Sequence, residues 1–174
     1  QTIGKIGQGL LFDGTNDYVN ITSFTGMPNI QSARTSSIWV YWATAPSTAR
    51  QILLYRNTTA GGENFGFHTL GGCSGNSLGV WKENGPFLVC TSQPTANAWH
   101  NIAVTFDGTT RRIYVDGTQA VASTTVGNSA TVNQINIGGA NFYSEFTNGT
   151  IDDIRIYNRA LSAAEIQRLY NMGR

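Results

Sequence analysis

Short runs of alternating apolar and polar residues, each ended by a turn sequence, constrain the fold of this chain more than any other feature. The clearest example covers residues 102–106, and the turn Asp107-Gly108-Thr109-Thr110 follows it. A second apolar run at residues 113–115 then leads into Asp116-Gly117. A period of two predicts half-buried β-strands, and Asp-Gly accommodates the positive φ of tight hairpin turns. These residues therefore predict an antiparallel hairpin.

The same pattern recurs along the chain and ends in one helix signal. Further strands are predicted at residues 10–12, 18–21, 38–42, 134–137 and 151–157. Ser162 and Glu165 have the spacing of a capping box, and an apolar stripe of helical period follows them. The sequence thus predicts an all-β fold, an antiparallel β-sandwich with one short C-terminal helix, as a single domain over residues 1–174.

Charge and hydropathy exclude two classes of partner. Charged residues make up only 12% of the 174, and eleven basic side chains against ten acidic ones give a net charge of +1. Nucleic-acid binders concentrate basic charge on one face, so we expect no nucleic-acid partner. No apolar run approaches the roughly 20 residues that a membrane span needs, so we expect no membrane insertion.

Two cysteines, Cys73 and Cys90, bear on the cellular compartment. A metal site would need further ligands close by, and a Cys-x-x-Cys motif is absent. A disulfide closing this loop would contribute about 3 kcal/mol and would indicate an oxidising, extracellular environment. Two free buried thiols are the alternative.

Three segments, in this order, resemble laminin G-like domains of the concanavalin A-like lectin/glucanase superfamily, which also includes pentraxins. They are Leu10-Leu11-Phe12-Asp13-Gly14-Thr15-Asn16-Asp17-Tyr18-Val19, the stretch from Trp99 to Gly108, and the ending from Gly149 to Ser162. The resemblance implies a jelly roll of two stacked antiparallel sheets. The ending is typical of bacterial members, which are modules of secreted or cell-surface proteins.

Glucanases share this fold, so catalysis has to be tested from the residues. The superfamily's β-glucanases carry Glu-x-Asp-x-x-Glu on one strand, and none of the four glutamates here has that spacing. A Gly-x-Ser-x-Gly nucleophile elbow is also absent. Of the two histidines, His100 is expected to be a hydrogen-bonded strand residue. His68 either faces a ligand or is an ordinary strand residue. We therefore expect a non-enzyme.

Calcium is the one cofactor that the sequence suggests, in a structural role. Asp13 and Asp17 flank a turn that contains Gly14, and many relatives hold calcium with a carboxylate at the position of Asp153. If the first and last strands are neighbours, these carboxylates and the Gly14 carbonyl converge, and calcium needs six to eight oxygen ligands. In the alternative, Asp13 serves an Asx-turn and Asp153 pairs with Arg155 or Arg159.

Aromatic residues are the candidates for sugar binding, because aromatic rings stack on the apolar faces of sugars. If Ile38, Val40 and Trp42 point inward, alternation places Trp39 and Tyr41 on a sheet face, although both faces of this strand are apolar and the opposite register is open. Trp81 either flanks a groove or packs at a strand end. Two further candidates, Phe142 and Tyr143, lie between late strands, and the expected ligand-binding set is Trp39, Tyr41, His68, Trp81, Phe142 and Tyr143.

Two functions from different classes follow. The first is a non-catalytic, lectin-like carbohydrate-binding module of a larger secreted or cell-surface protein, with a glycan or polysaccharide as its partner. The second is a structural or adhesive module of a bacterial surface assembly, with other surface proteins as partners. An apolar patch at an edge strand would favour the second.

Overall fold

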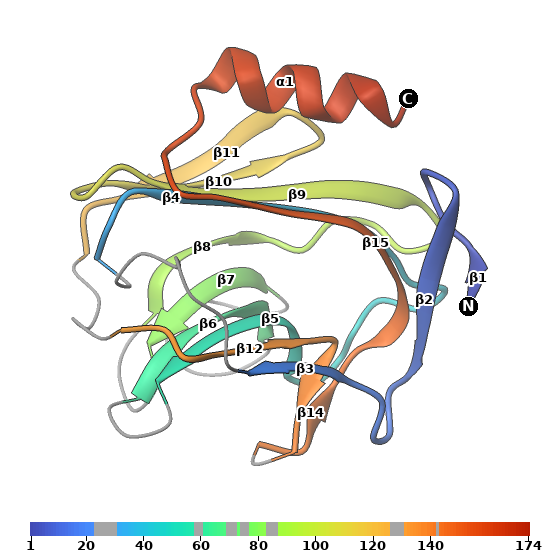
Figure 1. Cartoon of the computed structure of the whole chain (residues 1–174). Helices are drawn as coiled ribbons and strands as arrows, with labels where there is room; N and C mark the ends of the chain where they lie inside the picture. The colour runs from blue at the N-terminus through green and yellow to red at the C-terminus, as the bar shows by residue number, and fades with distance from the viewer. Residues whose placement is uncertain are drawn as a thin grey trace.

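The computed structural model describes residues 1–22, 31–57, 61–68, 73, 77–82, 87–125, 131–141 and 143–174, with the backbone alone at 57, 61–68 and 87. Within these residues the strands form two stacked sheets, the jelly-roll β-sandwich that the sequence predicts (Figure 1). The first sheet runs in the order β1 (Thr2–Ile3), β2 (Gln8–Asp13), β15 (Asn148–Tyr157), β4 (Arg34–Tyr41), β9 (Trp99–Phe106), β10 (Arg111–Val115) and β11 (Thr118–Ser123).

The second sheet packs against the first (Figure 1). Its order is β13 (Gly139–Ala140), β14 (Glu145–Phe146), β5 (Arg50–Asn57), β6 (Gly61–His68), β7 (Ser77–Lys82) and β8 (Phe87–Ser92). One further strand, β12 (Gln134–Ile137), pairs with both β5 and β3 (Val19–Thr22). Among the described strands, β14 pairs with β5 in parallel and the other pairs of this sheet are antiparallel.

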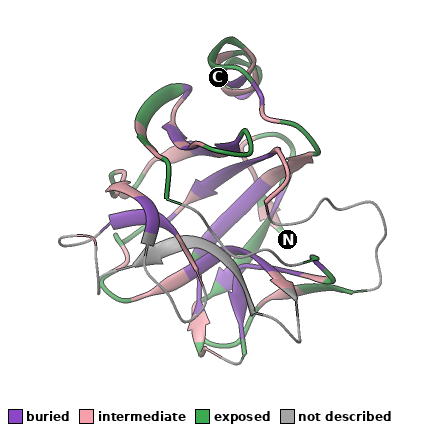
Figure 2. Ribbon diagram, turned by 90° about the vertical axis from the view of Figure 1, so that its left-hand side faces the viewer, coloured by how far each residue is buried: buried purple, intermediate pink, exposed green. Residues whose placement is uncertain are grey.

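The core lies between the two sheets, where alternate side chains of each strand meet. From β4 and its end, Ile38, Val40 and Trp42 point inward, each 0–1% exposed. Leu53 of β5 and Val80 of β7 meet them from the second sheet. Figure 2 shows the buried strands facing one another, with exposed residues on the outside. Of the two registers left open for residues 38–42, the structure has the one in which Ile38, Val40 and Trp42 point inward.

The C-terminal helix α1 (Ala163–Met172) covers part of the outer face of the first sheet (Figure 1). Ser162 and Glu165 form the expected capping box, which satisfies backbone groups at the helix start. Ile166 is fully buried and packs with Ala103 and Tyr114 of the sheet. The apolar stripe of the helix therefore anchors it to this face. No described helix has the length and apolar character to cross a membrane.

A disulfide joins Cys73 to Cys90 of β8, which confirms the predicted pairing. Both cysteine sulfurs are thereby used, and free thiols are excluded at these two positions. The bond ties the segment before β7 to the edge strand of the second sheet.

Candidate functional site

Two of the predicted ligand-binding aromatics, Trp81 and Tyr143, lie against each other on the second sheet. Leu78 and Val80 of β7 point into the core, so alternation turns Trp81 to the outer face. Tyr143 comes from the loop between β13 and β14, and the two ring centroids are 5.6 Å apart at 57°. Both side chains are only partly buried. Together they present aromatic surface on one side of the molecule.

Hydrogen bonds hold the loop that carries Tyr143. The Tyr143 N–H donates to the Ala140 carbonyl (3.1 Å), and the Ser144 N–H donates to the Asn141 carbonyl (3.3 Å). The Asn141 side-chain amide donates to the Tyr18 hydroxyl at 2.9 Å. Ser144 takes a left-handed φ of 54°, which turns the chain back into β14. The position of Tyr143 is therefore fixed from both sides of the loop.

Amide side chains occupy the same outer face. Asn136 lies between Ile135 and Ile137, which both point into the core, so its own side chain faces outward. Gln51 at the start of β5 is 0% exposed, and its Nε2 donates to the Glu145 carboxylate. Neither Asn136 Oδ1 nor Gln51 Oε1 accepts a hydrogen bond from the described residues.

The sheet register connects these residues. Asn136 of β12 lies opposite Leu54 of β5, Leu54 opposite Asn64 of β6, and Asn64 opposite Trp81 of β7. Three strand spacings therefore separate Asn136 from Trp81, roughly 14 Å across the sheet. We call Gln51, Trp81, Asn136, Tyr143 and Glu145 the amide–aromatic site.

Glu145 supplies the charge of the amide–aromatic site. Burial raises the pKa of its carboxyl above the ordinary value, and the hydrogen bond from Gln51 and the positive charge of Arg50 oppose this shift. The site as a whole offers aromatic faces and hydrogen-bond acceptors. These groups match a ligand that has both apolar C–H surface and hydroxyl donors.

Trp39 and Tyr41 lie on the opposite side of the sandwich from the amide–aromatic site. Alternation places both on the outer face of the first sheet, because Ile38, Val40 and Trp42 point inward, but Trp39 is only 1% exposed. Tyr170 of α1 stacks on its ring at 5.7 Å, and the Lys5 ammonium lies 5.1 Å from the ring centroid. The expectation that Trp39 offers its ring to a ligand is therefore wrong, because α1 covers it.

The remaining predicted ligand-binding residues do not join Trp81 and Tyr143. Tyr41 is partly buried, with its ring 5.8 Å from that of Trp99. His68 ends β6 opposite Ser77, and its side chain lies outside the described part of the chain. Phe142 also lies outside the described residues.

The carboxylates expected for calcium do not converge. Asp13 accepts from the Thr15 N–H at 2.7 Å, which is the Asx-turn alternative, and Asp17 accepts from the Asp13 N–H at 3.2 Å. Asp153 instead accepts from Arg155 at 2.9 and 3.0 Å.

The strand register explains this separation. Asn148 lies opposite Asp13, so Asp153 is five positions away, roughly 16 Å along β15. The described residues contain no group of three or more His, Cys, Asp or Glu able to hold a metal. The described carboxylates thus do not form a calcium site in this arrangement, and calcium binding by Asp13, Gly14, Asp17 and Asp153 stays a prediction.

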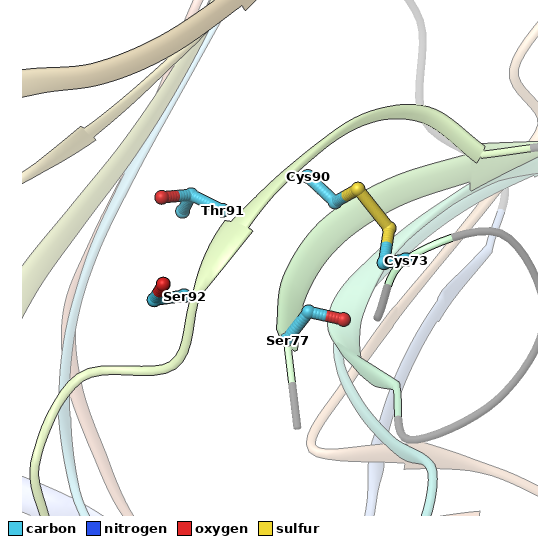
Figure 3. A pocket seen from close by; sticks show the side chains of 5 residues that line it. All are labelled: Cys73, Ser77, Cys90, Thr91 and Ser92. Carbon is cyan, nitrogen blue, oxygen red and sulfur yellow. A yellow bond between two sulfur atoms is a disulfide. The ribbon is translucent and has the colours of Figure 1, made fainter. Parts of the chain in front are cut away.

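A small hollow lies beside the disulfide, at the ends of β7 and β8 (Figure 3). Its volume is about 170 Å³, and the residues lining it are Cys73, Ser77, Cys90, Thr91 and Ser92. Its lining of small hydroxyl side chains and a disulfide gives the hollow no charged group and no distinctive shape for a ligand. The hollow therefore adds no chemistry to the amide–aromatic site.

Sequence reasoning missed three members of the site, Gln51, Asn136 and Glu145. A usable signal exists for Asn136, because an amide between two isoleucines of a strand must face away from the core. A similar signal exists for Gln51, because it directly precedes the apolar run of β5 and an amide beside a core residue faces away from the core. No sequence pattern reveals that β14 brings Glu145 to Gln51, since that pairing depends on the parallel contact of β14 with β5.

Solved structures of several lectin-like proteins are similar to this chain. Domain 4 of AbnA, a GH43 extracellular arabinanase from Geobacillus stearothermophilus solved with arabinotriose, gives a TM-score of 0.73 at 18% identity, covering 97% of this chain and 79% of that one. A heptameric SAP-like pentraxin from Limulus polyphemus gives 0.71 at 12% identity, covering 92% and 80%. The binding domain of Paraclostridial Mosquitocidal Protein 1 gives 0.71 at 14%, covering 98% and 45%. At these identities the likeness shows the fold.

Sequence comparison identifies the family. A search of curated proteins finds no match. The family model Laminin_G_3, described as "Concanavalin A-like lectin/glucanases superfamily", matches residues 13–167, which is most of the chain. The match agrees with the laminin G-like motifs, with the jelly-roll sandwich and with the structural neighbours. The chain belongs to the Laminin_G_3 family of the concanavalin A-like lectin/glucanase superfamily.

Proposed function

We propose that this chain is a non-catalytic carbohydrate-binding module of a secreted or cell-surface protein. The observation that carries the proposal is the meeting of Trp81 and Tyr143 on the face that also holds the amides of Gln51 and Asn136. The disulfide supports an extracellular setting, since such bonds persist in oxidising compartments. The similar AbnA domain was solved with arabinotriose, which supports a sugar as the class of ligand.

The two aromatic rings and the amides have different roles in binding. The rings take the apolar face of a sugar and exclude water there, as aromatic side chains do in other ligand sites. Amide oxygens accept hydrogen bonds from sugar hydroxyls and set the orientation of the ligand. Surface sites of this kind bind weakly, because ordered water competes for the same hydrogen bonds.

The test is a glycan array followed by calorimetry on the glycan class that binds. We expect Trp81→Ala to weaken binding at least tenfold, which corresponds to about 1.4 kcal/mol, because the variant loses one wall of the aromatic pair. Tyr41→Ala is the matched control: it removes a partly buried aromatic on the opposite side of the sandwich and should bind like wild type. Thermal melts verify that both variants fold.

Equal affinity of Trp81→Ala and wild type would contradict the proposed site. Silence of the wild-type protein across the array would overturn the proposed function and favour the adhesive alternative. One observation favours that alternative: Ile3 of the edge strand β1 and Leu11 of β2 are 87% and 61% exposed. Exposed apolar side chains at a sheet edge suit a protein partner.

A further inference from the structure

Two amide oxygens are buried without a donor on the outer face of the second sheet. Gln51 is 0% exposed and Asn136 2%, and neither Gln51 Oε1 nor Asn136 Oδ1 accepts a hydrogen bond within the described residues. A buried acceptor without a donor costs stability, and native proteins keep few of them. A group from outside the chain that donates to both oxygens would remove this cost.

The orientation of the Gln51 amide is determined by Glu145. A carboxylate offers only acceptors, so the Nε2 of Gln51 turns toward it and the Oε1 is directed elsewhere. The Oε1 of Gln51 is therefore left as a buried acceptor without a donor among the described residues. The pairing of β14 with β5 beside this residue keeps Glu145 in place.

The position of Asn136 is also fixed, because its strand β12 is anchored in the core. Ile135 and Ile137 anchor β12 in the core on either side of it. Its cross-strand neighbour in β3 is Asn20, which is exposed and whose Oδ1 accepts from the Gln134 amide at 2.8 Å. Solvent thus reaches Asn20, the residue directly beside Asn136, whereas Asn136 itself is covered, so the β3 side is the exposed side next to the buried oxygen.

We propose that Gln51 and Asn136 determine the specificity of the amide–aromatic site, by accepting hydrogen bonds from hydroxyls of a neutral glycan. This inference rests on the proposed function. Both oxygens accept and neither donates, so the ligand has to bring the hydrogen atoms. Free hydroxyls do this, whereas a methylated hydroxyl or an anionic group brings acceptors alone.

The test compares wild type with Asn136→Leu, which keeps a similar volume and removes the acceptor. The probes are the neutral glycan selected on the array and its analogues with single hydroxyls methylated. We expect Asn136→Leu to bind the free glycan about three- to tenfold more weakly. Methylation of the recognised hydroxyl should weaken wild type by the same factor and leave the affinity of the variant unchanged, because both changes remove one hydrogen bond.

A melting curve separates ligand recognition from a structural role. An oxygen left unsatisfied in the free protein is better replaced by an apolar group, so Asn136→Leu should melt at the same temperature as wild type or higher. If the oxygen instead binds a structural water, the variant should melt lower, and the inference is overturned. Gln51→Met tests the second oxygen by glycan affinity alone, because it also removes the Nε2 donor to Glu145 and is therefore expected to melt lower in any case.

The possible results distinguish this inference from the proposed function. If wild type binds a glycan and loses affinity on Trp81→Ala, but Asn136→Leu and Gln51→Met bind as wild type does, the specificity role fails and the carbohydrate-binding function stands. If wild type binds no glycan, both fail. A loss on Asn136→Leu that no methylated analogue reproduces also overturns the inference.

Discussion

At the scale of single residues, two glycines show how the cost of adding a side chain depends on the space around it. Gly138 has a φ of 78°, and a Cβ there would meet the ring of Phe12 in the core. Gly7 has a φ of 79°, and a Cβ there would meet nothing within 4 Å. The two positions share a backbone conformation that favours glycine and differ only in their surroundings.

We therefore expect Gly7→Ala to lower the free energy of unfolding by about 1 kcal/mol, the cost of a left-handed alanine. Gly138→Ala should cost about 1–3 kcal/mol more, because the methyl group also displaces the Phe12 ring. Urea denaturation of both variants measures the difference. Equal costs would show that Phe12 moves aside freely.

The alternation of side chains along a strand predicts which side chains share a face of the sheet. It does not predict which other segment covers that face. Trp39 and Trp81 both face away from the core, as period two requires. One is buried under Tyr170 of α1 and the other lies beside Tyr143 from the β13–β14 loop. These partners come from segments distant in sequence, so local pattern carries no information on them.

At the scale of elements, the capping box of α1 is predictable from four residues, and its charge partner makes it sensitive to pH. Arg159 donates to both carboxylate oxygens of Glu165, at 2.6 and 3.0 Å, and the Ser162 N–H donates at 2.9 Å. The hydrogen bond from Arg159, above all, lowers the pKa of Glu165 to about 2.

A carboxyl whose pKa is lower in the folded state stabilises the fold above its unfolded value, here 4.5, and loses that effect as the pH falls toward about 2. We expect Glu165→Gln to melt below wild type at pH 7 and the gap to close between pH 4.5 and 2. Ser162→Ala is the comparison: it loses the charge-independent bond from the Glu165 N–H as well as the Ser162 Oγ bond to the Glu165 carboxylate, so only part of its effect should disappear by pH 2. A gap that does not change with pH would contradict the role of the Arg159 pair.

At the scale of the whole molecule, the two sheets use their outer faces differently. On the first sheet, α1 packs over Trp39, Ala103 and Tyr114 and closes part of the face (Figure 1). On the second sheet, the outer face holds amides, a carboxylate and the Trp81–Tyr143 pair. The sandwich itself follows from strand patterns and family motifs, whereas this division depends on where one helix and one loop dock.

The Cys73–Cys90 disulfide should stabilise the whole sandwich, because it closes a loop with a sequence separation of 17 that includes β7. In the chain-entropy account, a loop of this length contributes about 3 kcal/mol by restricting the unfolded chain. We expect the double variant Cys73→Ser, Cys90→Ser to lose about that much free energy of unfolding in urea. Wild type treated with a reductant should match it, and the variant should not respond to the reductant. An unchanged midpoint in the double variant would mean that hydrogen bonds of β7 to β6 and β8 hold this region without the crosslink.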